Sequence, residues 1–124
     1  MADSHPIEGV WLPVKAELDG VAAPELVINR TELTLHKGSY KVVFAGEIHD
    51  RGRYEFVAQT EAEATLRLTL TSTHLDNKGR VLASIYQLVG NRLRICYGLD
   101  GVTPQAFATA LDSQRYLVTY RRQE

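Results

Sequence analysis

The most constraining feature of this sequence is a regular series of turn-forming residues that divides it into short apolar runs. Glycine, aspartate and asparagine tolerate the backbone angles of tight hairpin turns. The runs between them are rich in Val, Ile, Leu, Tyr and Thr, which favour strands. Many short strands with closely spaced turns predict an antiparallel sandwich or barrel. The turn signals are Asp19-Gly20, Lys37-Gly38, Asp50-Arg51-Gly52, Asp76-Asn77-Lys78-Gly79, Gly90-Asn91 and Asp100-Gly101.

The pattern predicts an all-β chain with one or two short helical turns. A helical turn is expected at residues 23–26, with Pro24 near its start. Thr103 and Pro104 resemble a capped helix start for residues 105–111, with an irregular loop as the alternative. The predicted strands are residues 8–18, 31–37, 40–46, 53–58, 64–73, 80–88, 92–98 and 115–122.

Two turns give conflicting predictions about which strand face points inward. A two-residue loop at Gly90-Asn91 pairs Tyr86 with Ile95 and places both on an apolar face. A four-residue loop at 76–79 would instead align Leu66, Leu68 and Leu70 with Ala83 and Ile85, on the opposite face. A bulge or one extra loop residue would reconcile the two registers.

Strand 80–88 is apolar on both faces, so it is expected to pack against something outside the sheet as well as inside. Val81, Ala83 and Ile85 form one face, and Leu82 and Tyr86 belong to the other. A partner subunit or a covering helix would serve as the outer cover.

Composition narrows the classes of function. The chain of 124 residues fits one domain, residues 1–124, with 44% hydrophobic and 23% charged residues. A net charge of −1 without a basic block argues against nucleic-acid binding. The sequence shows no signal peptide and no membrane-spanning run, so a cytoplasmic protein without a membrane partner is expected. The single cysteine, Cys96, cannot form an internal disulfide and is expected to be buried.

Several segments resemble a bacterial lipocalin-like family. Gly9-Val10-Trp11 is similar to the Gly-x-Trp signature of a first lipocalin strand, and residues 16–20 continue the match. Residues 85–96, which include Leu93-Arg94-Ile95-Cys96, resemble the same family, as do residues 103–107 and 116–122. The chain departs from the family pattern at Arg67 and Ala106, where the family usually carries acidic residues, so a family function using those carboxylates would be lost.

The resemblance implies an eight-stranded up-and-down barrel closed at one end by Trp11. A last-strand arginine, Arg121 or Arg122, would lie across the indole ring. Eight strands enclose an interior that is either filled by side chains or wide enough for one small ligand.

The chain offers little for metal or cofactor chemistry. Its four histidines are far apart in sequence and do not have the spacing of metal ligands, so no metal site is expected. They are His5, His36, His49 and His74. No phosphate-binding glycine loop is present, and no cofactor is expected.

We therefore expect a small-molecule binding barrel that holds an apolar or amphipathic ligand. Two alternatives remain at this point. One is an isomerase or cyclase that uses Glu17 and a tyrosine for acid–base chemistry. The other is a fully packed interaction module, such as a homodimer, docking through strand 80–88. The residues predicted to contact a ligand are Trp11, Glu17, Tyr86, Arg94, Tyr97 and Phe107.

Overall fold

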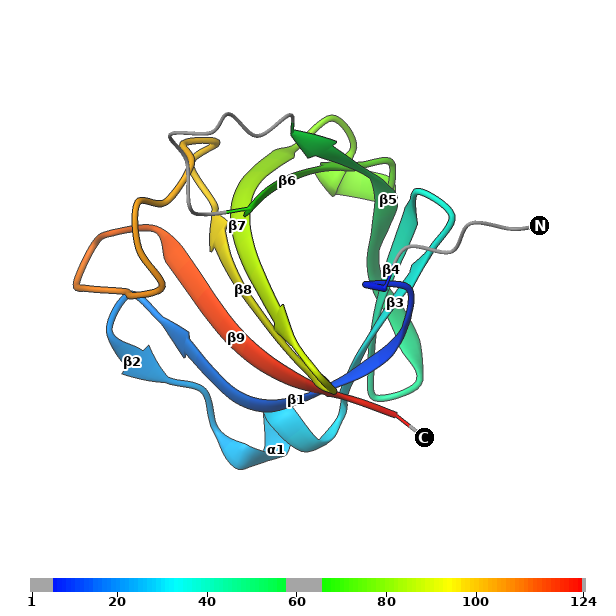
Figure 1. Cartoon of the computed structure of the whole chain (residues 1–124), viewed down its shortest axis with the longest axis horizontal. Helices are drawn as coiled ribbons and strands as arrows, with labels where there is room; N and C mark the ends of the chain where they lie inside the picture. Colours follow the sequence, from blue (N-terminus) through cyan, green and yellow to red (C-terminus); the bar gives the residue numbers. More distant parts are fainter. Residues whose placement is uncertain (1–5, 58–65, 124) are drawn as a thin grey trace.

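The chain folds into a closed antiparallel β-barrel, as predicted (Figure 1). The computed structural model describes residues 6–57 and 66–123. His5, the last residue of predicted strand 53–58 and the first two residues of predicted strand 64–73 lie outside them. The elements are β1 (Gly9–Leu18), β2 (Val21–Ala22), α1 (Glu25–Asn29), β3 (Thr31–His36), β4 (Ser39–Phe44), β5 (Glu47–Val57), β6 (Leu66–Ser72), the short 3-10 helix η1 (Leu75–Asn77), β7 (Val81–Val89), β8 (Arg92–Gly98) and β9 (Arg115–Arg122).

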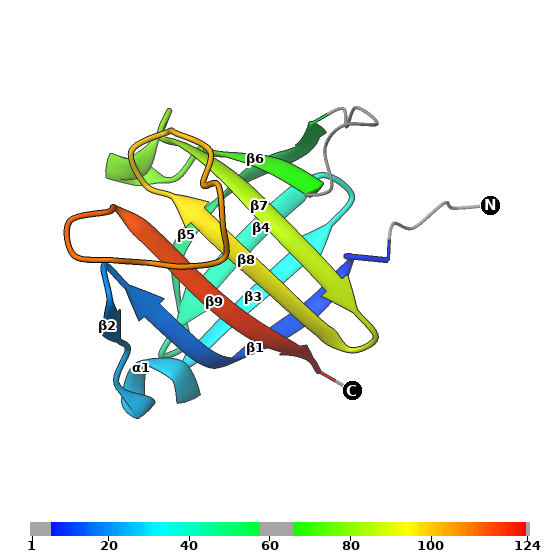
Figure 2. The same cartoon turned by 60° about the vertical axis from the view of Figure 1, so that its left-hand side comes forward.

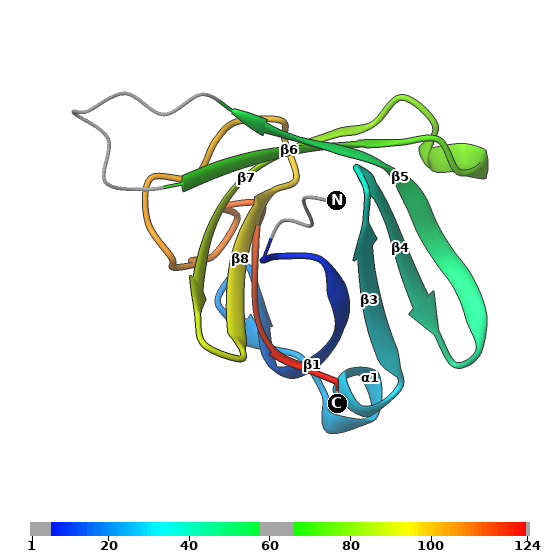
Figure 3. The same cartoon turned by 45° about the vertical axis from the view of Figure 1, so that its right-hand side comes forward.

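Neighbouring strands of the barrel are consecutive in the chain. The order is β1-β3-β4-β5-β6-β7-β8-β9, and β1 pairs with β9 to close the cylinder. The two-residue strand β2 is an extra element, which pairs with the end of β1. Figure 3 shows the strands curving round a single interior. The eight-stranded up-and-down barrel is confirmed.

The connections gather at two ends, which we call the open end and the closed end. The open end carries residues 19–30, 45–46, 73–80 and 99–114. The closed end carries residues 6–8, 37–38 and 90–91. Helix α1 and β2 lie at the opposite end of the barrel from residues 6–8 (Figure 2). None of the helices within residues 6–57 and 66–123 is long and apolar enough to cross a membrane.

The predicted turn at Asp50-Arg51-Gly52 is wrong, because these residues lie inside strand β5. The actual hairpin turn is Ala45-Gly46, where both residues have positive φ angles of 53° and 84°. Alanine is a weak signal for such a turn, since its side chain disfavours positive φ. Gly52 instead allows the backbone of β6 to approach closely, in a space that a side chain would occupy.

The connection between β6 and β7 resolves the register conflict. Leu68 pairs with Ser84 and Leu70 with Leu82, so the face inferred from the Gly90-Asn91 hairpin is the inner one. A four-residue loop at 76–79 is wrong. The strands diverge after Ser72 and meet again at Arg80, with η1 between them. Residues 73–79, an odd number, lie between the paired Ser72 and Arg80. The β7 side chains that align with the inward leucines of β6 are therefore those of the opposite face from the one that a four-residue loop would align.

The chain itself covers the middle of the outer apolar face of β7 and β8, while Val81 at its edge is 42% exposed. Ile85 is 2% exposed and Cys96 is fully buried, although both point away from the barrel interior. Residues 99–114 cross this surface without forming a helix (Figure 2). The expected helix at 105–111 is therefore replaced by its alternative, an irregular loop, and the predicted turn at 23–26 becomes α1, whose N-cap is Pro24.

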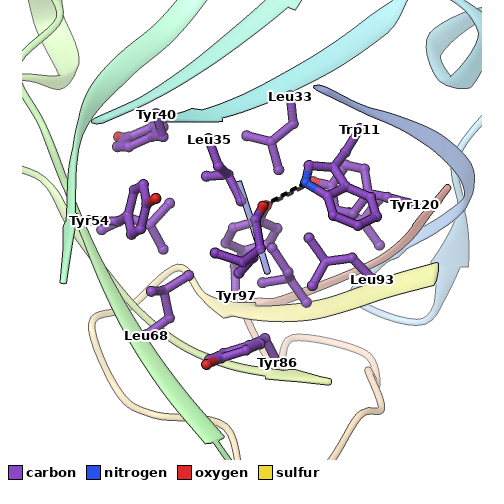
Figure 4. Close-up of a cluster of buried hydrophobic side chains, with 14 of the residues drawn as sticks. Trp11, Leu33, Leu35, Tyr40, Tyr54, Leu68, Tyr86, Leu93, Tyr97 and Tyr120 are labelled. Atoms are coloured by element: carbon purple, nitrogen blue, oxygen red, sulfur yellow. Dashed lines mark hydrogen bonds between the residues drawn. The ribbon is translucent and has the colours of Figure 1, made fainter. Parts of the chain in front are cut away.

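The closed end is sealed around Trp11, which is fully buried (Figure 4). Its indole Nε1 donates a hydrogen bond to the carbonyl oxygen of Ile7 at 2.9 Å. The guanidinium of Arg122 lies 4.3 Å from the centre of the indole ring. Arg122 also donates to the carbonyl oxygens of Glu8 and Pro6, each at 2.6 Å. Of the two arginines proposed to cover the ring, the structure identifies Arg122.

Candidate functional site

The open half of the barrel contains a cavity of about 770 Å³. Apolar side chains of several strands form most of its wall, and β2 and α1 border it at the open end. A volume of this size is typical of sites for small organic ligands. The apolar lining residues include Leu18, Val27, Leu33, Val42, Phe44, Leu70, Leu82 and Leu99.

One wall of the cavity carries a hydrogen-bonded polar cluster centred on Asp50. The hydroxyl of Tyr40 donates to Oδ2 of Asp50 at 3.0 Å, and Oγ of Ser72 donates to Oδ1 at 2.6 Å. Burial, together with the negative charge of Asp50, raises the pKa of Tyr40 well above its usual range. Tyr40 therefore remains neutral and donates to the carboxylate over the ordinary pH range.

A bulge in β5 accounts for the position of this cluster. Val42 of β4 pairs with Asp50, while Val43 pairs with Ile48, which leaves His49 as an extra residue. Bulges of this kind redirect side chains and are common beside functional sites. Both His49 and Asp50 contribute to the cavity wall. The sequence contained no signal for the bulge, so the prediction missed both residues.

Arg80 and His49 add two further polar side chains to the cavity wall. Arg80 acts electrostatically on the Tyr40 hydroxyl and lowers its pKa slightly against the dominant effect of burial. Within residues 6–57 and 66–123, neither the Arg80 nor the His49 side chain has a hydrogen-bond or ion-pair partner. Both side chains can therefore bind a polar group without breaking an interaction with this part of the protein.

A second polar feature lies where the cavity meets the packed core. The hydroxyls of Tyr97 and Tyr120 are 2.8 Å apart and form one hydrogen bond. Both residues line the cavity and also belong to the buried core, with exposed fractions of 6% and 4%. Burial raises the pKa of each hydroxyl well above the ordinary range, so both tyrosines are neutral.

The predicted ligand-contacting residues fall into separate places, and Tyr97 is the one that lines the cavity. Trp11 lies in the packed closed end. Tyr86 is buried in the core, where its ring is 6.0 Å from that of Phe56.

Of the other three predicted residues, Phe107 lies in the outer loop 99–114, and Arg94 and Glu17 contact this loop. The guanidinium of Arg94 lies 4.0 Å from the centre of the Phe107 ring, and Arg94 also donates to Gln87 at 2.9 Å. Glu17 accepts a hydrogen bond of 2.6 Å from the Thr109 hydroxyl. These contacts attach the loop to the barrel and do not contribute to the cavity wall.

The described residues contain no cluster of His, Cys, Asp and Glu that could hold a metal ion. Cys96 is a buried thiol whose pKa is raised by burial, which disfavours the reactive thiolate. No family model, no curated protein and no solved structure matches this chain. The function is therefore inferred from the geometry of the cavity.

Proposed function

We propose that this protein binds a small amphipathic molecule inside its barrel, with the polar end of the ligand at the open end. The observation that carries this proposal is the cavity of about 770 Å³, which combines an apolar wall with a polar cluster at Asp50. Removing apolar ligand surface from water supplies most of the affinity at such a site, and a few polar groups orient the ligand.

Arg80 and His49 are the groups proposed to contact the polar end. Both line the cavity, whereas both carboxylate oxygens of Asp50 already accept hydrogen bonds from Tyr40 and Ser72. An arginine donates hydrogen bonds and cannot accept them, so it favours a ligand group with acceptor oxygens. The lipocalin-like sequence resemblance agrees with interior binding of this kind.

The two other candidate functions have less support. The enzyme hypothesis relied on Glu17, whose carboxylate bonds to Thr109 of the outer loop. Tyr40 could replace it, but its raised pKa makes it a poor proton donor or acceptor near neutral pH. The interaction hypothesis relied on the outer face of strand 80–88, which is covered at Ile85, while Val81 on the same face is 42% exposed.

The proposal is tested with anilinonaphthalenesulfonate, a fluorescent amphiphilic dye with apolar aromatic rings and an anionic sulfonate. The wild-type protein should bind it saturably and be stabilised against heat by it. Leu82→Trp, which fills the cavity, should abolish binding, and the milder Leu82→Phe should weaken it. Val89→Trp places the same new ring at a site that is 65% exposed and serves as the control. Equal dye binding by the folded Leu82→Trp and Val89→Trp proteins would reject the proposal.

A further inference from the structure

The Tyr97–Tyr120 pair contains one more hydroxyl proton than its hydrogen bonds to the described residues use. Each tyrosine hydroxyl carries a single proton, and the pair shares one hydrogen bond of 2.8 Å. Whichever hydroxyl donates in that bond, the proton of the other is left over. Among residues 6–57 and 66–123, no further acceptor bonds to either hydroxyl.

The position of this pair makes the spare proton relevant to binding. Both rings line the cavity, and both are almost fully buried at the boundary with the closed half. The neighbouring lining side chains include the apolar Leu33 and the ring of Tyr116, which stacks on Tyr97 at 5.8 Å. An acceptor atom that enters the cavity can take this proton, whereas an apolar group placed there would leave a buried donor without an acceptor, which costs free energy.

We propose that the spare proton is donated to a neutral carbonyl oxygen at the innermost end of the ligand. This inference rests on the proposed function and adds a second polar contact to it. The ligand would be polar at both ends, with its apolar middle against the barrel wall. A ketone, ester or amide oxygen fits this chemistry.

A neutral acceptor is favoured over a carboxylate because of the surroundings. Among residues 6–57 and 66–123, the basic side chains that line the cavity are Arg80 and His49, and both lie beside the open-end connections. Burying an unpaired carboxylate among apolar side chains would cost far more than burying a carbonyl that receives one hydrogen bond. The high pKa values of both tyrosines keep the donor protons in place.

The test compares benzophenone with diphenylmethane, which share a carbon skeleton and differ by the carbonyl oxygen. Each displaces the bound dye, and the dissociation constants are obtained by competition. Transfer from water alone favours burial of the hydrocarbon. We expect the wild-type protein to bind benzophenone at least as tightly as diphenylmethane, because the tyrosine pair compensates for the desolvation of the carbonyl.

Tyr97→Phe and Tyr120→Phe identify the donor. One of the two hydroxyls carries the spare proton. The variant that removes this hydroxyl should weaken benzophenone binding about tenfold, while diphenylmethane binding changes less than about twofold. The double variant should show the same loss even if the remaining hydroxyl can reorient in one of the single variants. Tyr86→Phe removes the hydroxyl of a tyrosine outside the cavity lining and should leave both affinities unchanged.

The possible outcomes separate this inference from the proposed function. If both compounds displace the dye but the wild-type protein prefers diphenylmethane, interior binding stands and the carbonyl site is wrong. An unchanged ratio of the two affinities in the double variant also overturns it. If neither the dye nor the two compounds bind, the proposed function itself fails.

Discussion

The two ends of this barrel use similar side chains in opposite ways. At the closed end, Trp11 is enclosed by Ile7 and Arg122, and the interior is packed. At the open end, inward-facing residues such as Val42 and Leu82 surround a cavity of about 770 Å³. The same strands run through both halves, so the strands alone do not determine the hollow. The comparison shows that side-chain size and packing decide which end is hollow. Trp11, covered by Arg122, fills the closed end, while smaller side chains leave space at the open end.

The largest contrast is expected from truncating one inward side chain at each end. Trp11→Ala should lower the free energy of unfolding by about 3–5 kcal/mol, because it leaves a void in a packed region. Leu82→Ala, beside the existing cavity, should cost about 2 kcal/mol, near the low end for such substitutions. Urea unfolding measures both. Equal losses at the two sites would mean that the two halves are packed alike.

Removing the cover of the indole should also affect the closed end selectively. Arg122→Ala loses the contact with the Trp11 ring and the hydrogen bonds to Glu8 and Pro6. We expect a loss of about 2 kcal/mol in the free energy of unfolding. Arg121→Ala, which removes an exposed arginine from the same strand, is the control. Dye affinity should be unchanged in both, and a loss of affinity in Arg122→Ala would show that the ends are coupled.

The two ends can also be compared by their dependence on pH. Burial raises the pKa of Tyr120 above the ordinary value of 10.0. Its stabilising contribution is therefore complete below about pH 10 and is lost as the pH rises through the folded-state pKa. Tyr120→Phe should reduce the fall in stability above pH 10 by up to about 1.4 kcal/mol per pH unit.

This measurement reports whether the boundary of the cavity is dry. Urea unfolding at several alkaline pH values gives the slope, and Tyr86→Phe in the packed half gives the reference. Burial also raises the pKa of Tyr86. If the fall in stability above pH 10 is the same in Tyr120→Phe as in the wild-type protein but is reduced in Tyr86→Phe, water reaches the Tyr97–Tyr120 pair.

The smallest effect is expected from enlarging a side chain that faces the cavity. Val42→Phe should raise the free energy of unfolding by about 1 kcal/mol, because the ring enters empty space. Leu35→Phe in the fully buried closed half should instead be destabilising, by about 1–3 kcal/mol. Thermal and urea unfolding compare the two. If both substitutions changed the free energy of unfolding in the same direction, the open half would not be more loosely packed than the closed half.

The fold was predictable because turn chemistry and alternation are local properties of the sequence. The hairpin at Gly90-Asn91 fixed the register of β7 and β8, and the Gly-x-Trp segment identified Trp11 as a buried residue. The error at Asp50-Arg51-Gly52 has a physical cause. An aspartate and a glycine close together favour a turn, but here they serve a buried cluster and a close approach between strands.

The candidate site was less predictable because it depends on facing and on long-range packing. A single bulged residue, His49, decides that Asp50 joins the cavity wall. Arg94 and Phe107 were expected to contact a ligand, yet they meet each other on the outer surface. No local pattern distinguishes a side chain that faces a cavity from one that lies under a covering loop.

The bond between Arg122 and Glu8 joins residues 114 positions apart. Barrel closure therefore depends on contacts between the first and last strands, which are among the most non-local in the chain. Closing so large a loop slows folding, so the seam should form late and the kinetics should be those of a slow all-β protein. Until β9 docks, the Trp11 side of β1 has no neighbour along that edge, and it remains an exposed apolar edge for a molecular chaperone to shield.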